Sequence, residues 1–409
     1  MAIPHFLVVG AGIVGAACAR ELAREGNRVT VIDSGPGAGL QGGTAAGMGH
    51  VVVNEGDPDT LKLCLRGREL WRSDAPPMSE RDSYWETGTL WIAEDEETLL
   101  QLEGAQKKLE SVGVVSERID GRQLIKLEPA LAPDLAGGLR VPHDGVIYAP
   151  TAAREFLNAS PKVTCHFGVS VKNIGDGMVE LTDGRIFEGE AVIVATGISV
   201  LTILGEAGAR LAEKVSLYPR EGHLAITARG TRILDHHIVE AGYQKAAHST
   251  SNHSISNHST SHHSTSHAGS KSGSVACAIL PRQTDQLCLG SSRRPGEPGP
   301  VDPNMMMRVI DRCERFVPSV KTLPILRTWT GARAATSDGK PLLGPVPGLQ
   351  RTWIAAGFEG LGITQAPAAA ELIRQRIMGE SCTLDPWPWD PARPYKNNSA
   401  LTKRESDHA

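Results

Sequence analysis

The 409-residue sequence has no excess of basic residues, no paired cysteines and no long apolar run. Its formal charge of −4 provides no basic field for nucleic acid or anionic lipid, so we expect small-molecule chemistry. The seven cysteines are scattered, odd in number and without a C-x-x-C pair. They therefore argue against a disulfide framework and a zinc site, and they fit a reducing cytosol.

No segment approaches the roughly twenty apolar residues that a membrane-spanning helix needs. We therefore expect a cytoplasmic protein, at most peripheral at the inner face of a membrane. With 40% hydrophobic and 22% charged residues, the composition is that of an ordinary globular protein long enough for two domains.

The N-terminal stretch predicts a strand, a glycine turn, a helix and a second strand, which is a dinucleotide-binding unit. Gly10 permits the tight turn, Gly12 leaves backbone amides open to a pyrophosphate, and Gly15 lets the helix lie close to the strand. Asp33 follows roughly twenty residues later at the end of the second strand, where its carboxylate can accept hydrogen bonds from ribose hydroxyls. A ribose 2′-phosphate would be repelled there, which argues against an NADP-type ligand.

The glycine-rich loop after Asp33 continues into Thr44-Ala-Ala-Gly-Met-Gly-His50. Small residues in this density indicate either a flexible loop or backbone that lies against a flat ring. His50 is the only ionisable side chain of that loop and is either catalytic or a hydrogen-bonded loop histidine. Tyr148 either faces a ligand or is a buried tyrosine with a satisfied hydroxyl.

The middle of the chain predicts a helix over 59–73, a β-prone segment over 84–93 and an amphipathic helix over 94–112. Alternating residues over 162–194 predict a β-meander that ends in an apolar strand at 191–197, which we expect beside the first strand. Residues 215–289 predict the sheet of a second domain.

Four pentads from His248 to His267 consist almost entirely of Ser, Thr, Asn and His. With almost nothing to bury, this tract predicts a mobile loop. Metal capture by its six histidines is the alternative.

The segment 353–364 predicts a strand, a glycine loop and the start of a helix. A second glycine-to-helix turn so far along the chain favours a dinucleotide larger than NAD. FAD fits, because its ring needs hydrogen-bond donors at the edge that carries the negative charge of the reduced flavin.

Several motifs in order then resemble the FAD-dependent D-amino-acid oxidase and glycine oxidase superfamily. These motifs are GAGIVG, TAAGMGH, PREGHLAIT, GSSR, W-T-G-x-R-x-x-T-x-D-G-x-P-x-x-G and GFEGLGIT. Within the superfamily, the sequence is most similar to D-hydroxyproline dehydrogenase and related D-amino-acid dehydrogenases.

The resemblance implies an α/β fold with a discontinuous Rossmann-like FAD-binding domain (1–82, 145–215 and 326–385) and a β-rich α+β substrate domain (83–144 and 216–325). We expect a disordered His/Ser-rich insertion at 248–274, within the second of these segments of the substrate domain, and a flexible tail at 397–409. The resemblance also places Arg333 on the substrate carboxylate as a bidentate clamp, with a structural salt bridge as the alternative. Together with the motifs, it gives this set of cofactor-binding residues: Gly10, Gly12, Ile13, Val14, Gly15, Asp33, Ser34, Thr44, Ala45, Ala46, Gly47, Met48, Val171, Ala195, Thr196, Gly197, Arg333, Gly357, Gly360, Leu361, Gly362, Ile363 and Thr364.

Two positions depart from the glycine oxidase pattern. Ala278 stands where those enzymes place a tyrosine against the carboxylate, and Glu359 stands where they have an arginine. Covalently flavinylated relatives need a cysteine in the C-terminal flavin loops, and residues 314–381 contain none. The resemblance therefore implies noncovalent FAD.

The implied reaction is oxidation of a D-amino acid, best cis-4-hydroxy-D-proline or D-proline, to the imine, with oxygen or an electron-transport carrier as acceptor. Glycine, sarcosine or an opine as substrate, an NAD-dependent dehydrogenase, and a flavoprotein without activity remain as alternatives. A homo-oligomer and a subunit of a larger dehydrogenase complex both stay open.

Overall fold

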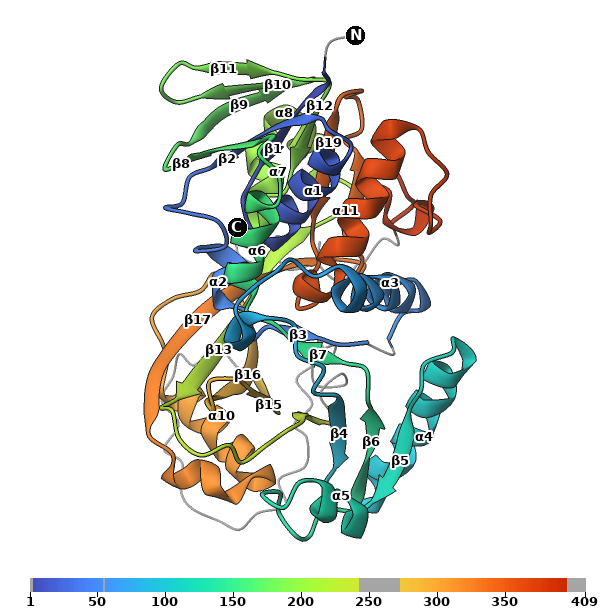
Figure 1. The fold of residues 1–409 in the computed structure, drawn as a ribbon, viewed down its shortest axis with the longest axis vertical. Coiled ribbons are helices and arrows are strands. Elements are labelled where there is room, and N and C mark those ends of the chain that lie inside the picture. Colours follow the sequence, from blue (N-terminus) through green and yellow to red (C-terminus); the bar gives the residue numbers. More distant parts are fainter. Residues whose placement is uncertain (1–2, 54–55, 243–272, 396–409) are drawn as a thin grey trace, which may run out of the picture. The chain divides into compact units, whose positions relative to one another are not determined.

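The computed structural model describes residues 3–53, 56–242 and 273–395 (Figure 1). The chain divides into two compact units, each made of more than one segment of the chain. The first comprises Met1–Trp85, Asp144–Arg220 and Gly331–Ala409, and the second comprises Glu86–His143 and Glu221–Thr330. The His/Ser pentads and the C-terminal tail after residue 395 lie outside the described residues.

The first unit is built on a six-stranded sheet in the order β18-β19-β12-β1-β2-β8. All neighbours pair in parallel except β18 and β19, which are antiparallel. The strands are β1 (His5–Val9), β2 (Arg28–Asp33), β8 (Val163–Phe167), β12 (Ala191–Val194), β18 (Leu342–Pro345) and β19 (Thr352–Ala356). The predicted α/β class is confirmed, and so is the position of the 191–197 strand beside the first strand.

Both faces of this sheet are buried, because successive side chains of a strand point to opposite sides. From β1, Phe6 and Val8 join the core under the long helices, whereas Leu7 and Val9 join the core on the other face. The helices of the first core are α1 (Ile13–Arg24), α3 (Pro58–Asp74), α6 (Ala149–Asn158) and α11 (Gly362–Met378). The opposite face is covered by β9 (Val171–Gly175), β10 (Met178–Leu181), β11 (Ile186–Glu188), α7 (Val200–Ile203) and α8 (Gly205–Ala212).

The predicted meander over 162–194 is only partly right. Strands β9, β10 and β11 form a three-stranded antiparallel sheet and β12 lies beside β1 as expected, but β8 belongs to the parallel sheet. The sequence misleads at β8 because this edge strand is half-exposed, so its alternation resembles that of an antiparallel strand.

Helices α1 and α11 pack against each other, although they come from opposite ends of the chain (Figure 1). Inside α11, Pro367 has no N–H to donate to the carbonyl of Ile363, four residues earlier. The indole Nε1 of Trp71, in α3, donates to that carbonyl oxygen instead, at 2.8 Å. This bond fixes the first turn of α11 to α3.

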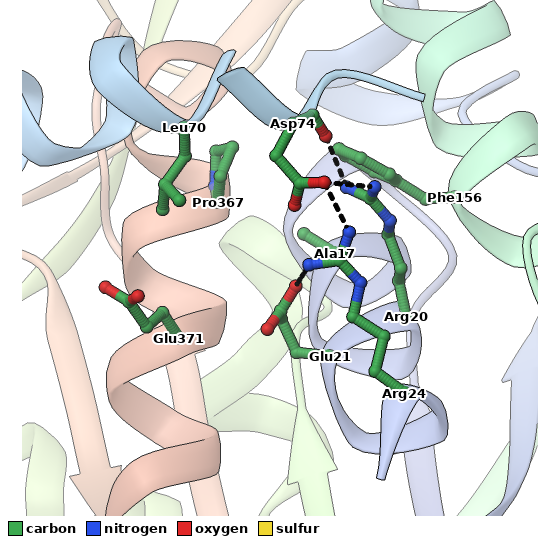
Figure 2. Close-up of a pocket in the computed structure, with 9 residues that line it drawn as sticks. All are labelled: Ala17, Arg20, Glu21, Arg24, Leu70, Asp74, Phe156, Pro367 and Glu371. Atoms are coloured by element: carbon green, nitrogen blue, oxygen red, sulfur yellow. Dashed lines mark hydrogen bonds and ion pairs between the residues drawn. The ribbon is translucent and has the colours of Figure 1, made fainter. Parts of the chain in front are cut away.

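A cavity of about 50 Å³ lies among α1, α3, α6 and α11 (Figure 2). At its wall, Asp74 accepts hydrogen bonds from Arg20 at 3.2 Å and from Arg24 at 2.6 Å, while Glu21 accepts one from Arg24 at 3.0 Å. None of the predicted site residues lines this cavity. The charged side chains that line the cavity largely neutralise one another, and we assign these ion pairs a structural role.

The second unit contains most of an eight-stranded sheet in the order β17-β13-β16-β15-β14-β4-β6-β5. The unit boundary falls within β13 and β17, which therefore belong to both units. The strands are β4 (Thr89–Ala93), β5 (Glu117–Asp120), β6 (Gly137–Val141), β13 (Leu217–Thr227), β14 (His237–Glu240), β15 (Ser274–Pro281), β16 (Leu287–Pro295) and β17 (Ile325–Thr336). Its helices are α4 (Glu96–Ser111), α5 (Gly121–Leu127) and α10 (Pro303–Phe316).

The predicted helices at 59–73 and 94–112 are confirmed as α3 and α4, whereas the β-prone segment at 84–93 forms a strand only from Thr89. The first unit also contains the short helix α2 (Gly42–Ala46), the strand pair β3 (His50–Val51) and β7 (Gly145–Val146), and three single-turn 3-10 helices. Among the described helices, none is both long and apolar enough to cross a membrane.

Candidate functional site

The turn after β1 brings two neighbouring strand ends into close contact. Gly10 has a φ of +102°, and a Cβ at this position would lie 2.5 Å from the carbonyl oxygen of Ala195, at the end of β12. A Cβ on Gly15, one turn into α1, would overlap the carbonyl oxygen of Gly10. Both glycines are therefore required by the fold itself, because any side chain would push α1 away from the sheet.

The N-terminus of α1 presents backbone amides at this turn. Gly12 is the N-cap of α1 and has no side chain to cap the helix. The amide of Ile13 donates to the Thr44 hydroxyl at 2.9 Å, so Thr44 provides a cap from a distant segment. First-turn amides have no acceptor within their own helix and lie at its positive end, which suits a phosphate.

Asp33 is fixed at the end of β2. Its carboxylate accepts hydrogen bonds from the amides of Ala11 and Gly35, each at 2.6 Å. These bonds orient the carboxylate beside the glycine turn, and each oxygen keeps a lone pair for a further donor. The geometry is compatible with the predicted ribose contact. Ser34, the next residue, is exposed.

Two further segments lie near these strand ends. The amide of Val169 donates to the carbonyl oxygen of Asp33 at 3.2 Å, and β9 begins at Val171, two residues later. The buried hydroxyl oxygen of Thr196 has no hydrogen-bond partner among the described residues. A buried hydroxyl without a partner costs about 1–3 kcal/mol, so Thr196 has unused capacity to bind a ligand.

The glycine-rich loop packs against the start of α11. The amide of Val52 donates to the Thr364 hydroxyl at 3.1 Å, and a Cβ at Gly47 would lie 2.9 Å from the Cδ1 atom of Ile363. Nε2 of His50 lies 3.1 Å from the carbonyl oxygen of Gly360. Because a carbonyl can only accept, Nε2 carries the proton in this bond. His50 thus makes the hydrogen bond that the alternative of a hydrogen-bonded loop histidine predicts.

Strand β17 contacts both the glycine-rich loop after Asp33 and the loop before α11. Glu359 donates its amide hydrogen to the carbonyl oxygen of Ala334 in β17, at 2.8 Å. The neighbouring residue Arg333 is half-buried. Farther along the strand toward its start, a Cβ on Gly331 would overlap the Cβ of Ala46. Strand β17 therefore holds Arg333 where the loop after Asp33 meets the loop before α11.

Most of the predicted site residues thus gather in two groups within the first unit. The glycine turn, Asp33, Val171 and Ala195–Gly197 lie at the ends of β1, β2 and β12. Residues Thr44–Met48, Arg333 and Gly357–Thr364 form the second group, and Thr44 connects it to the first. Tyr148 stands apart as the N-cap of α6 and is 44% exposed, so the alternative of a buried tyrosine is wrong.

Sequence reasoning missed Arg220. Its guanidinium lies 3.4 Å from the carboxylate of Glu359, and it donates to the Tyr218 hydroxyl at 2.9 Å. The PREGHLAIT motif contains this arginine, but its partner lies 139 residues away, and no local pattern connects the two.

The cysteine nearest in sequence to the glycine turn is a poor nucleophile. Cys18 in α1 is the nearest cysteine in sequence to the glycine turn, and burial, reinforced by Glu21, raises its pKa to about 12. The thiol is therefore protonated and unreactive at neutral pH. Among the described residues, no group of three His, Cys, Asp or Glu side chains could hold a metal ion.

Both a protein-family model and individual proteins of known name are similar to this sequence over much of its length. A family model described as "FAD dependent oxidoreductase" matches residues 5–376. The glycine oxidase of Geobacillus kaustophilus (strain HTA426) is 24% identical over 94% of this chain and 96% of its own. A D-amino acid dehydrogenase of Methylobacterium sp. (strain 4-46) is 29% identical over 55% of this chain and 68% of its own.

Solved structures share the fold. The crystal structure of glycine oxidase from Geobacillus kaustophilus superposes with a TM-score of 0.78 at 23% identity, over 96% of this chain and 100% of that one. The crystal structure of L-proline dehydrogenase from P. horikoshii gives 0.75 at 22% identity, over 96% and 99%.

Proposed function

The chain belongs to the family of FAD-dependent oxidoreductases, and we propose that it oxidises a small D-amino acid, with cis-4-hydroxy-D-proline or D-proline as the best candidates. The cofactor of the family is FAD. The glycine oxidase and D-amino acid dehydrogenase relatives support an amino-acid CH–NH or CH–NH2 donor. The solved structures support the fold alone.

One observation carries the substrate part of this proposal. Strand β17 presents a half-buried arginine, Arg333, directly beside Ala334, whose carbonyl oxygen binds the loop before α11. A guanidinium at this place can hold a carboxylate through two parallel hydrogen bonds. An α-amino acid held in this way has its Cα and amine in a fixed orientation.

The residues present fit FAD. Apart from Ile13, whose amide donates to Thr44, the first-turn amides of α1 have no acceptor in their own helix and would bind the pyrophosphate, and the oriented carboxylate of Asp33 would bind the adenosine ribose. Thr196 lies next to the turn, since a Cβ on Gly10 would be 3.2 Å from its amide nitrogen. Its buried hydroxyl has no partner among the described residues and could bind the cofactor. The amides of Gly360 and Gly362, at the start of α11, would stabilise negative charge on the ring, whereas the Leu361 amide already donates to the carbonyl oxygen of Phe358. Since residues 314–381 contain no cysteine, binding would be noncovalent.

When bound, FAD supplies a hydride acceptor for the Cα–H bond of the substrate. The protein's own part is mainly orientation. Arg333 holds the carboxylate, and the loops at Thr44–His50 and Gly357–Gly362 are fixed to each other by the His50 and Thr364 hydrogen bonds. If the amine binds in its neutral form, no side-chain base is required, and correct placement provides most of the rate enhancement.

An alternative substrate in the same class is glycine, sarcosine or an opine. The glycine oxidase relative favours this alternative. The different residues at Ala278 and Glu359 argue against inferring the same substrate for this chain. A flavoprotein without activity is a third hypothesis. The three make different predictions for reduction of the bound flavin.

The test is an anaerobic titration of the FAD-loaded protein with cis-4-hydroxy-D-proline, D-proline, L-proline, glycine and sarcosine, followed by flavin absorbance. We expect the yellow colour to bleach fastest with the two D-prolines. Bleaching by glycine or sarcosine alone would establish the alternative substrate class. A flavin that no amino acid reduces would contradict the proposed activity.

A further inference from the structure

The loop between β19 and α11 contains an unusual backbone conformation. Glu359 has a φ of +50°, in the left-handed region, and is one of two described non-glycine residues with positive φ. Glycine adopts this conformation without strain, whereas a glutamate is disfavoured there. The chain nevertheless has a glutamate at this position, between Phe358 and Gly360. The side chain must therefore contribute something that glycine would not.

The Glu359 side chain is committed to an ion pair. Its carboxylate lies 3.4 Å from Nη1 of Arg220, and the two side chains are only 18% and 17% exposed. Nη2 of Arg220 donates to the Tyr218 hydroxyl, and the guanidinium stacks on the Tyr218 ring at 5.3 Å. The arginine is thus held from two sides, on the part of β13 that belongs to the first unit.

This ion pair lies beside the groups assigned to the flavin ring. The backbone of Glu359 binds Ala334, the neighbour of Arg333, and the next residue, Gly360, accepts the His50 hydrogen bond. The amides at the start of α11 follow directly. A partly buried charge interacts strongly over such short distances, because little water screens it.

We propose that Arg220 and Glu359 are positioning residues that hold this loop and set the charge balance next to the flavin. The proposal rests on the proposed function, because it requires FAD with its ring at this loop. The paired charges cancel each other in the native protein. Removal of the carboxylate takes one negative charge away from the ring, which stabilises the anionic reduced flavin, and removal of the guanidinium takes one positive charge away, with the opposite effect.

The test measures the midpoint potential of bound FAD in Glu359→Gln, Arg220→Gln and the double variant. We expect Glu359→Gln to shift the oxidised-to-reduced equilibrium about tenfold toward the reduced form, which is about +30 mV for a two-electron couple. Arg220→Gln shifts it by a similar factor in the opposite direction, and the double variant returns near the native potential. Glu359→Gly shifts the potential as Glu359→Gln does, because the charge and not the backbone is responsible.

Glu371→Gln is the matched control. It breaks the ion pair with Arg66, which joins α3 to α11 at 2.6 Å and is similarly buried, but Glu371 lies more than two turns along α11. We expect this variant to be less stable at an unchanged potential.

A purely structural role would move the Glu359 and Arg220 variants in the same direction, and that result would overturn the proposal. So would an unchanged potential in both, or a shift in Glu371→Gln as large as theirs. Failure of the native chain to bind FAD would instead refute the proposed function.

Discussion

The two glycines Gly10 and Gly12 stand two positions apart and are required for different reasons. Gly10 has a positive φ and touches the backbone of Ala195, so the folded chain needs it. Gly12 has a φ of −66° and a ψ of 174°, which any residue can adopt, and its nearest neighbour is the Thr44 hydroxyl. A Cβ on Gly12 would lie 3.2 Å from that hydroxyl, so a small shift of Thr44 would accommodate it, and we infer that a ligand approaching the helix start is the stronger reason for glycine here.

We therefore predict that Gly12→Ala separates binding from folding. Its unfolding free energy without FAD should fall by about 1 kcal/mol or less, the usual effect of a poorer N-cap. Its FAD dissociation constant should rise roughly 100-fold, because hydrogen bonds to a charged phosphate contribute about 1.5–3 kcal/mol. Urea unfolding and FAD titration measure the two quantities.

Gly10→Ala is the comparison variant. It should lose on the order of 2–3 kcal/mol of stability even without FAD, from backbone strain and the clash with Ala195. A Gly12→Ala protein that binds FAD normally would show that the phosphates do not approach this turn.

Arg333→Ala should raise KM roughly 10- to 100-fold while FAD stays bound, because a charge-assisted carboxylate clamp is lost. Arg333→Lys should recover only part of the affinity, since an ammonium group cannot form two parallel bonds. Arg327→Ala is the control, because Arg327 lies on the same strand but stacks on Trp329. If Arg333→Ala had native kinetics, Arg333 would not be part of the substrate site.

Among the secondary-structure elements, those defined by a short stretch of sequence could be predicted, and contacts between distant segments could not. The β1–α1–β2 unit was predictable because its glycines, apolar runs and Asp33 lie within 33 consecutive residues. The Thr44 cap on α1 and the Arg220–Glu359 pair were not, because each joins segments far apart in the chain. The edge strand β8 was misassigned because half-exposed edges of parallel and antiparallel sheets have the same alternation.

The start of α10 is an element whose stability should depend on pH. The backbone amide of Asp302, its N-cap, donates to Nε2 of the fully buried His223 at 3.2 Å. Nδ1 then carries the proton and faces the Ser292 hydroxyl at 3.0 Å. Burial lowers the pKa of His223 below its ordinary value of 6.5, against the opposing charges of Glu221 and Asp302 and with a smaller contribution from Arg294.

Because the folded-state pKa is the lower one, the unfolded chain binds the proton more readily. The corresponding stability is fully present above pH 6.5 and is lost as the pH falls through the folded-state pKa. We predict that His223→Gln reduces the slope of unfolding free energy against pH below 6.5, by up to about 1.4 kcal/mol per pH unit. Urea unfolding between pH 8 and 5 measures the slope. Equal slopes in both proteins would contradict this assignment.

At the scale of the whole molecule, the chain passes between the two units several times. The first unit draws on three separate stretches, and the candidate site uses residues from all three. A ligand that contacts Gly12, Thr196 and Gly360 together would therefore tie distant parts of the chain to one another. Binding to the folded state alone raises stability in proportion to the logarithm of ligand concentration. The protein should consequently unfold at higher temperature as FAD is added.

Titration of the apoprotein with FAD is the direct test of the proposed cofactor site. We expect each chain to bind one FAD, turn yellow, and release all of the flavin into solution on denaturation. An apoprotein that shows a cooperative unfolding transition, and is therefore folded, but takes up no FAD would contradict it.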